Sequence, residues 1–193
     1  MSDFLDFLIR LCLFCGLHSL LAAPRTKARI LEKAGSSFQP FYRLTYNLFS
    51  LILFGWVMLA WQSTRVLFVA PGLWSLLLHG MQAVILIAAF ICLKQTGMGA
   101  FLGTDRSQND NDLPFITTGC YSVVRHPLYL LGIIFMLLNP VITTRWLTFT
   151  LVTVPYLLFG AYIEERRMLN RWGDRYRQYQ NQVPFLLPSR QRD

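Results

Sequence analysis

Long uncharged stretches alternate with short charged segments along this chain. Residues 44–64, 66–93, 126–144 and 146–163 contain no Asp, Glu, Lys or Arg. Each block is close to or longer than the roughly 18–20 residues that cross a bilayer as a helix. A fifth apolar stretch, 4–23, carries only Asp6 and Arg10 as charged residues. The pattern predicts an all-α, polytopic membrane protein of about five transmembrane helices, with a C-terminal helical hairpin and a cytoplasmic C-terminal helix.

The alternative for residues 4–23 is a secretory signal peptide that ends at residue 23. Such a peptide begins with basic residues and avoids positive charge after its cleavage site. Here Asp3 and Asp6 come first, and three basic residues follow between positions 25 and 29. We therefore favour a membrane helix.

Composition agrees with a membrane protein, and the distribution of charge predicts its orientation. The chain is 54% hydrophobic and 15% charged, with a formal net charge of +8. The first, third and final connections between the expected helices hold 15 of the 18 Lys and Arg residues. Because cytoplasmic loops are enriched in Lys and Arg, the N-terminus is expected outside and the C-terminus in the cytoplasm. The basic surplus also attracts lipid headgroups, and nucleic acid is not an expected partner.

Two connections are long enough to have structure or function of their own. Residues 24–43 are predicted to lie along the cytoplasmic headgroups. Residues 94–125 form the longest connection, and loops of that length are usually functional or disordered. We place the domain boundary inside it: residues 1–112 comprise the N-terminal helices, the basic loop and a polar linker, and residues 113–193 comprise the C-terminal hairpin and tail.

The four cysteines, at positions 12, 15, 92 and 120, predict neither a disulfide framework nor a zinc site. Cys12 and Cys15 have the spacing of a redox motif but lie inside an apolar helix, where small, weakly polar residues commonly serve packing. No metal is expected.

The two ends of the C-terminal hairpin carry the candidate chemistry. The expected helices 127–142 and 146–163 are joined only by residues 143–145, so both free ends lie on the same side. Pro127 suits a first helical turn, where free N–H groups and the helix dipole favour an anion beside Arg125 and His126. Glu164 and Glu165 lie at the other end, where negative charge needs a cationic or donating partner. Alone, either end is typical of a membrane border. Together they suit a ligand with a carboxylate, an ammonium and hydroxyl groups, and Tyr121 and Tyr129 are expected at the same mouth.

The residues at the two ends of the hairpin also resemble those of a known family. The run Gly119-Cys120-Tyr121-Ser122-Val123-Val124-Arg125-His126-Pro127-Leu128-Tyr129, the Glu164-Glu165 pair and the later Gly173-Asp174, Tyr176, Tyr179 and Val183-Pro184 resemble the membrane methyltransferases related to isoprenylcysteine carboxyl methyltransferase. The likeness covers roughly residues 113–188. It implies that the hairpin and its flanking loops bind S-adenosyl-L-methionine. The contacts it implies, together with Arg125 from the argument above, are Leu113, Pro114, Phe115, Ile116, Tyr121, Arg125, His126, Pro127, Leu128, Tyr129 and Glu164.

The N-terminal half narrows the resemblance. Residues 18–27 and 42–50, with Trp61-Gln62, look like the bacterial methanethiol S-methyltransferase branch, whose members commonly begin with one more hydrophobic helix. They also resemble a related family, associated with denitrification and carotenoid isomerisation, in which histidines can hold haem. Gly160 stands where isoprenylcysteine enzymes place a substrate-binding arginine, so recognition of a substrate carboxylate is less expected.

These observations predict an integral membrane S-adenosyl-L-methionine-dependent methyltransferase, and the resemblance to a bacterial branch implies the bacterial inner membrane as its location. Its expected partners are a small or lipophilic thiol, such as methanethiol, and membrane lipid. Glu165, or a nearby arginine, is the candidate for assisting deprotonation of that thiol or for stabilising the thiolate. The alternatives are an isoprenylcysteine carboxyl or phospholipid methyltransferase and, from another class, a haem-binding accessory protein or isomerase that uses His18, His79 or His126. A purely structural membrane protein is a third reading.

Overall fold

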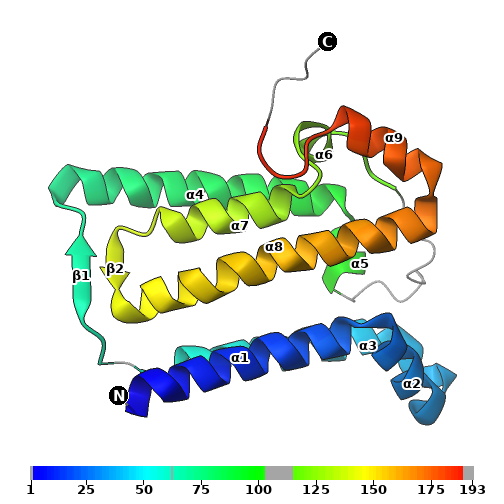
Figure 1. Cartoon of the computed structure of the whole chain (residues 1–193), viewed down its shortest axis with the longest axis horizontal. Coiled ribbons are helices and arrows are strands. Elements are labelled where there is room, and N and C mark those ends of the chain that lie inside the picture. The colour runs from blue at the N-terminus through cyan, green and yellow to red at the C-terminus, as the bar shows by residue number, and fades with distance from the viewer. Residues whose placement is uncertain (1, 62, 103–114, 189–193) are drawn as a thin grey trace. The chain divides into compact units, whose positions relative to one another are not determined.

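The computed structural model describes residues 2–61, 63–102 and 115–188, which form two compact units (Figure 1). The first unit contains the helices α1 (Ser2–Ala22), α2 (Pro24–Ala34), α3 (Gln39–Met58) and α5 (Met98–Leu102), with a 3-10 turn at Ser36–Phe38. The second contains the strands β1 (Val66–Val69) and β2 (Val141–Thr143) and the helices α4 (Gly72–Gln95), α6 (Cys120–Val123), α7 (Pro127–Leu137), α8 (Thr144–Trp172) and α9 (Asp174–Gln182).

The first unit is an antiparallel pair of helices, α1 and α3. Phe4 contacts Trp61 at one end of the pair, whereas His18 contacts Tyr46 and Ser50 toward the other. The two charges inside α1 neutralise each other, because Arg10 lies four residues after Asp6 and pairs with it at 2.9 Å. The helix predicted at 4–23 is confirmed as α1, which runs from Ser2 to Ala22.

The basic segment after α1 is helical as well. Proline occupies the first position of α2, where its missing N–H costs nothing. None of the residues of α2 is buried.

Three of the described helices are long and apolar enough to cross a membrane: α1 from Asp3 to Ala22, α4 and α8. The uncharged block at 66–93, which was expected to hold a membrane helix, contains most of α4. The helix expected from residue 44 is present as α3 but is not among these three, and α7 is a shorter apolar helix of 11 residues. The predicted count of about five spans is supported for three helices.

The connection between the last two apolar helices differs from the prediction. α7 ends at Leu137 rather than Ile142, because Pro140 lacks the N–H that a continuing helix needs. The residues after Pro140 instead form β2, which pairs antiparallel with β1. Thr143 then caps α8, its hydroxyl oxygen accepting from the Trp146 N–H at 3.1 Å. The prediction of a three-residue turn was wrong, although the two helices form an antiparallel hairpin as expected.

The polar continuation of the last span is two helices rather than one. α8 runs through Pro155 to Trp172, and Gly173 then has a φ of +51°, which favours glycine and ends the helix. α9 follows at an angle set by that residue. Within the second unit, α6 and α9 lie at the end opposite the two strands (Figure 1).

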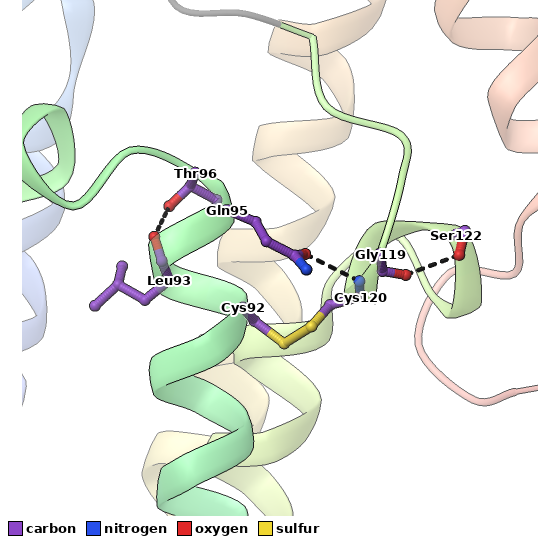
Figure 2. The surroundings of a disulfide bond; sticks show 7 residues. All are labelled: Cys92, Leu93, Gln95, Thr96, Gly119, Cys120 and Ser122. Carbon is purple, nitrogen blue, oxygen red and sulfur yellow. Dashed lines mark hydrogen bonds between the residues drawn. A yellow bond between two sulfur atoms is a disulfide. The ribbon is translucent and has the colours of Figure 1, made fainter.

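The expectation that the cysteines form no disulfide is wrong. Cys92, in the last turn of α4, is bonded to Cys120 at the start of α6 (Figure 2). Twenty-eight residues separate them, so only the packing of α4 beside α7 brings them together. Gln82 of α4 also donates to the Phe135 carbonyl of α7 at 3.1 Å. The helix α4 thus packs with the C-terminal hairpin, while the boundary proposed near residue 112 stays a prediction.

Candidate functional site

The centre of the site is an ion pair between the two ends of the hairpin. Arg125 Nε donates to Glu165 Oε1 at 2.9 Å, and Nη2 donates to Oε2 at 3.0 Å. Such a two-pronged contact fixes both planes and is among the stronger hydrogen-bonded arrangements in proteins. The Glu165 residue is only 6% exposed. The prediction that the two ends of the hairpin meet is confirmed.

The C-terminal segment completes the surroundings of this pair. Tyr176 donates to Glu165 Oε1 at 2.6 Å, and the Gln180 side-chain amide donates to Oε2. Arg125 Nη1 donates to the Gln180 and Val183 carbonyls, at 3.0 and 2.6 Å. Its backbone N–H donates to the Pro184 carbonyl at 2.9 Å. The segment after α9 is thus held against Arg125 by backbone carbonyls of Val183 and Pro184.

Hydrogen-bonding roles assign the tautomer of His126, which is 5% exposed. Its Nε2 lies 2.9 Å from Glu165 Oε1. A carboxylate oxygen only accepts, so Nε2 carries a hydrogen. Nδ1 is then the nitrogen on the side of Glu164, whose Oε2 lies 4.0 Å away. His126 also contacts the ring of Phe185, with centroids 4.9 Å apart.

Glu164 is the exposed member of the acidic pair. Its side chain is 41% exposed, and it accepts a hydrogen bond from the Tyr129 hydroxyl. The Tyr129 ring lies edge-to-face to His126, with centroids 5.5 Å apart. It also rests on α8, where a Cβ added to Gly160 would lie 3.7 Å from Tyr129 Cε1. A polar mouth therefore surrounds the Glu164 carboxylate.

Tyr121 belongs to the same mouth. Burial, followed by the charge of Glu164 and the neighbouring Tyr179, raises the pKa of Tyr121 to about 12. The phenol is therefore neutral and able to donate at physiological pH. His126, Tyr129 and Glu164 therefore lie together as expected, and Tyr121 is near enough to Glu164 for its charge to contribute to the raised pKa of Tyr121.

The other predicted contacts have different surroundings. Phe115 stacks on Trp172, with ring centroids 5.5 Å apart, and also packs against Tyr176 and Tyr179. Pro127 is buried at the start of α7, and Ile116 and Leu128 are half-buried. Leu113 and Pro114 lie outside the described residues. The mouth thus contains part of the predicted set, while Phe115 belongs to an aromatic cluster.

Sequence reasoning missed the role of α9. Burial, and then the hydrogen bond to Glu165, raises the pKa of Tyr176 well above its ordinary value. Tyr176 consequently keeps the hydrogen that it donates to the carboxylate. Tyr179 donates to the Tyr121 carbonyl at 2.5 Å. The Tyr-x-x-Tyr spacing was a usable signal, since residues three apart lie on one helical face. The contribution of Gln180 had no such signal.

These contacts divide the site into a support and a mouth. Glu165 receives five donor atoms, from Arg125, His126, Tyr176 and Gln180. Four of the five N–H donors of Arg125 are engaged by protein oxygens. Arg125 and Glu165 are therefore mainly supports. The mouth offers an exposed carboxylate, neutral phenols and an imidazole nitrogen, a set that suits a ligand with ammonium and hydroxyl groups.

Comparison with known proteins places the chain in a family. Residues 6–138 match the model of the family described as NnrU protein. The chain is 32% identical to a methanethiol S-methyltransferase of Pseudomonas deceptionensis over 162 residues, which cover 80% of this chain and 62% of that protein. It is 30% identical to methanethiol S-methyltransferase 1 of Bradyrhizobium diazoefficiens over 195 residues, which cover 95% and 66%.

The chain thus spans about two thirds or slightly less of the length of these two relatives. No solved structure was found that matches it. The family model covers α1 to α7 and ends before α8, so it includes Arg125 and His126 but not the acidic pair. The match extends over more than half of the chain, and this protein therefore belongs to the NnrU protein family.

Proposed function

We propose that this chain is a membrane methyltransferase that uses S-adenosyl-L-methionine and methylates a small or lipophilic thiol such as methanethiol. The observation that carries the proposal is the mouth formed by Tyr121, His126, Tyr129 and Glu164 above the buried Arg125–Glu165 pair. The names of the similar methanethiol S-methyltransferases support the reaction class.

The residue types of the mouth fit the cofactor. The exposed Glu164 carboxylate would accept hydrogen bonds from an ammonium or from ribose hydroxyls, and Tyr121 would donate to a carboxylate. The aromatic faces of Tyr121 and Tyr129 are suitable neighbours for a sulfonium. When bound, S-adenosyl-L-methionine supplies an electrophilic methyl group. The protein contributes position and exclusion of water, which together account for much of the rate of such transfers.

Glu165 has a role in this proposal that differs from deprotonation of the thiol. Five donor atoms already point at its carboxylate, which leaves little capacity to accept another hydrogen. We assign it to holding Arg125 and His126 in place. The base role stays a prediction, and these contacts weigh against it. The acceptor would reach the mouth from the bilayer, on the cytoplasmic side that the charge distribution predicts.

Calorimetry in detergent tests cofactor binding. We expect S-adenosylhomocysteine to bind the protein and Glu164→Gln to weaken that binding at least tenfold, because a charged hydrogen bond contributes roughly 1.5–3 kcal/mol. Glu32→Gln is the matched control, since it removes an exposed carboxylate of α2. Equal binding by the two variants would overturn the site. Radiolabelled cofactor offered with methanethiol, an isoprenylcysteine or a phospholipid amine would then identify the acceptor.

A haem-binding accessory protein is the second candidate. The observation in its favour is that the family match includes all three histidines, His18, His79 and His126. Each has a hydrogen-bonding partner: His18 contacts Ser50 and Tyr46, His79 the Ser75 carbonyl, and His126 Glu165. A Soret band in purified protein that His18→Ala abolishes would support this function, and its absence after growth with haem would exclude it.

A further inference from the structure

The short helix α6 leads directly into the candidate site. It contains four residues, Cys120–Val123, and the chain then continues through the buried Val124 to Arg125 and His126. A single helical turn is not stable by itself, because nucleation costs more than one hydrogen bond returns. The position of α6, and with it that of Tyr121, therefore depends on contacts with neighbouring elements.

Three contacts anchor the start of α6, and only one of them is covalent. The disulfide joins Cys120 to Cys92 of α4, and Gln95 Oε1 accepts from the Cys120 N–H at 3.0 Å (Figure 2). From the other side, the Tyr179 hydroxyl donates to the Tyr121 carbonyl. Without the disulfide, α6 would be held to α4 by the Gln95 hydrogen bond and to α9 by that of Tyr179.

The surroundings of the two sulfur atoms differ. Cys92 is 3% exposed, whereas Cys120 is half-buried. An external thiolate therefore has better access to the Cys120 sulfur, and exchange rates depend on such access.

The expected orientation gives this bond its significance. The end of α4 and the segment that contains α6 fall in a connection that the charge distribution assigns to the cytoplasm. Cytoplasmic thiols are kept reduced, and disulfides there are usually transient and serve catalysis or redox sensing. A permanent disulfide is expected in an oxidising compartment, and an exchangeable disulfide in a reducing one.

We propose that Cys92–Cys120 is a thiol–disulfide exchange site that controls the order of α6 and thereby the cofactor mouth. The reductant is a pair of thiols, either two glutathione molecules or one dithiol, and one of its thiolates attacks the Cys120 sulfur. The sulfur–sulfur bond breaks, and Cys92 leaves as a thiolate that takes a proton from water. The second thiolate of the reductant then attacks the mixed disulfide and releases Cys120. The cysteine pair gains two electrons, and the reductant ends as a disulfide.

The consequence for ligand binding rests on the proposed function, whereas the exchange itself does not. In the reduced protein α6 visits conformations in which Tyr121 lies away from Glu164. If the binding-competent conformation falls to a tenth of the population, the apparent Kd for S-adenosylhomocysteine rises about tenfold. Reoxidation restores the original affinity.

The test uses the full chain in membrane vesicles equilibrated in glutathione buffers of increasing reducing strength. Acid quenching and a maleimide that shifts gel mobility would report the state of the cysteine pair. We expect Cys92 and Cys120 to open within the cytoplasmic range of glutathione buffers, and the Cys15→Ser control to leave this transition unchanged. A pair that stays bonded in strongly reducing glutathione, or that never forms, would overturn the proposal.

Amide hydrogen exchange supplies a readout that needs no ligand. On reduction, amides of residues 119–125 should exchange at least about tenfold faster, and Cys120→Ala should show the fast rate in every buffer. Reduction of the wild-type protein avoids dependence on a variant that fails to fold. Unchanged exchange after complete reduction would refute control of α6. Faster exchange in a protein that binds no S-adenosylhomocysteine would support the switch and refute the proposed function instead.

Discussion

Neutralising Glu165 should destabilise the second unit far more than neutralising its neighbour. The Glu165 carboxylate is buried, and its two oxygens receive five donor atoms, three at Oε1 and two at Oε2. In Glu165→Gln one of the two oxygens becomes an NH₂ group. The better placement of that group is at Oε2, where it faces donors from Arg125 and Gln180.

The magnitude follows from the loss of the partner of Arg125, because the Gln180 amide can rotate and present its oxygen to the new NH₂ group whereas a guanidinium can only donate. Each buried donor left without an acceptor costs about 1–3 kcal/mol. One such donor, together with the buried Arg125 charge that loses its partner, gives about 4 kcal/mol, within the roughly 3–5 kcal/mol lost when one partner of a buried ion pair is removed. The free energy of unfolding, measured by denaturant titration in a mild detergent, should therefore fall by about 4 kcal/mol in Glu165→Gln.

Glu164→Gln provides a matched control on the same helix. Its side chain is 41% exposed, and an amide oxygen can still accept from Tyr129. Its unfolding free energy should change by less than about 1 kcal/mol. The two variants thus distinguish Glu165, which stabilises the fold of the site, from Glu164, which is proposed to contact the ligand. If Glu165→Gln were within about 1 kcal/mol of the unmodified protein, the idea that this carboxylate organises the site would be refuted.

Two further predictions concern the same end of the second unit. Gly119→Ala should lower the unfolding free energy by about 2–3 kcal/mol, because φ is +63° and the new Cβ would lie 2.3 Å from Gln95 Nε2. Gly132→Ala is its control, since a Cβ there meets nothing within 4 Å. The midpoint of thermal unfolding of this variant should be no lower than that of the unmodified protein. Burial raises the pKa of Tyr179 to about 12. The contribution of its neutral phenol to the free energy of unfolding is therefore complete below pH 10 and disappears between pH 10 and about 12. Denaturant titrations across that range should show a loss that Tyr179→Phe reduces but does not abolish, because the pKa values of Tyr121 and Tyr176 are raised as well. A pH dependence unaltered by this substitution would contradict the assignment.

Two separate anchors position the residues of the site. The disulfide fixes where α6 begins, whereas the Arg125–Glu165 pair fixes where α7 begins relative to α8. Tyr121 lies along the chain between these anchors, and the charge of Glu164 contributes to the raised pKa of Tyr121. Loss of either anchor should therefore weaken ligand binding, but only loss of the ion pair should strongly reduce global stability.

Local sequence determined the helices and the two ends that carry charge. Apolar stretches predicted α1, α4 and α8 because apolar side chains need lipid or a protein core, and this requirement is visible in composition alone. The meeting of Arg125 with Glu165 was predictable because a short connection between two helices places their free ends together. The position of Pro140 could have corrected the end of α7, since proline cannot continue a helix.

Only tertiary structure decided which groups share a hydrogen bond or a covalent bond. Cys92 and Cys120 are 28 residues apart, and no local pattern states that the end of α4 packs beside α6. The direction of α9 depends on the backbone at Gly173, and this direction brings Tyr176 and Gln180 to the carboxylate. Sequence therefore determined the types of group at the hairpin ends, because periodicity and charge are local properties. The division into a buried Glu165 that supports the site and an exposed Glu164 that faces the ligand arose from packing, because burial depends on elements distant in the chain.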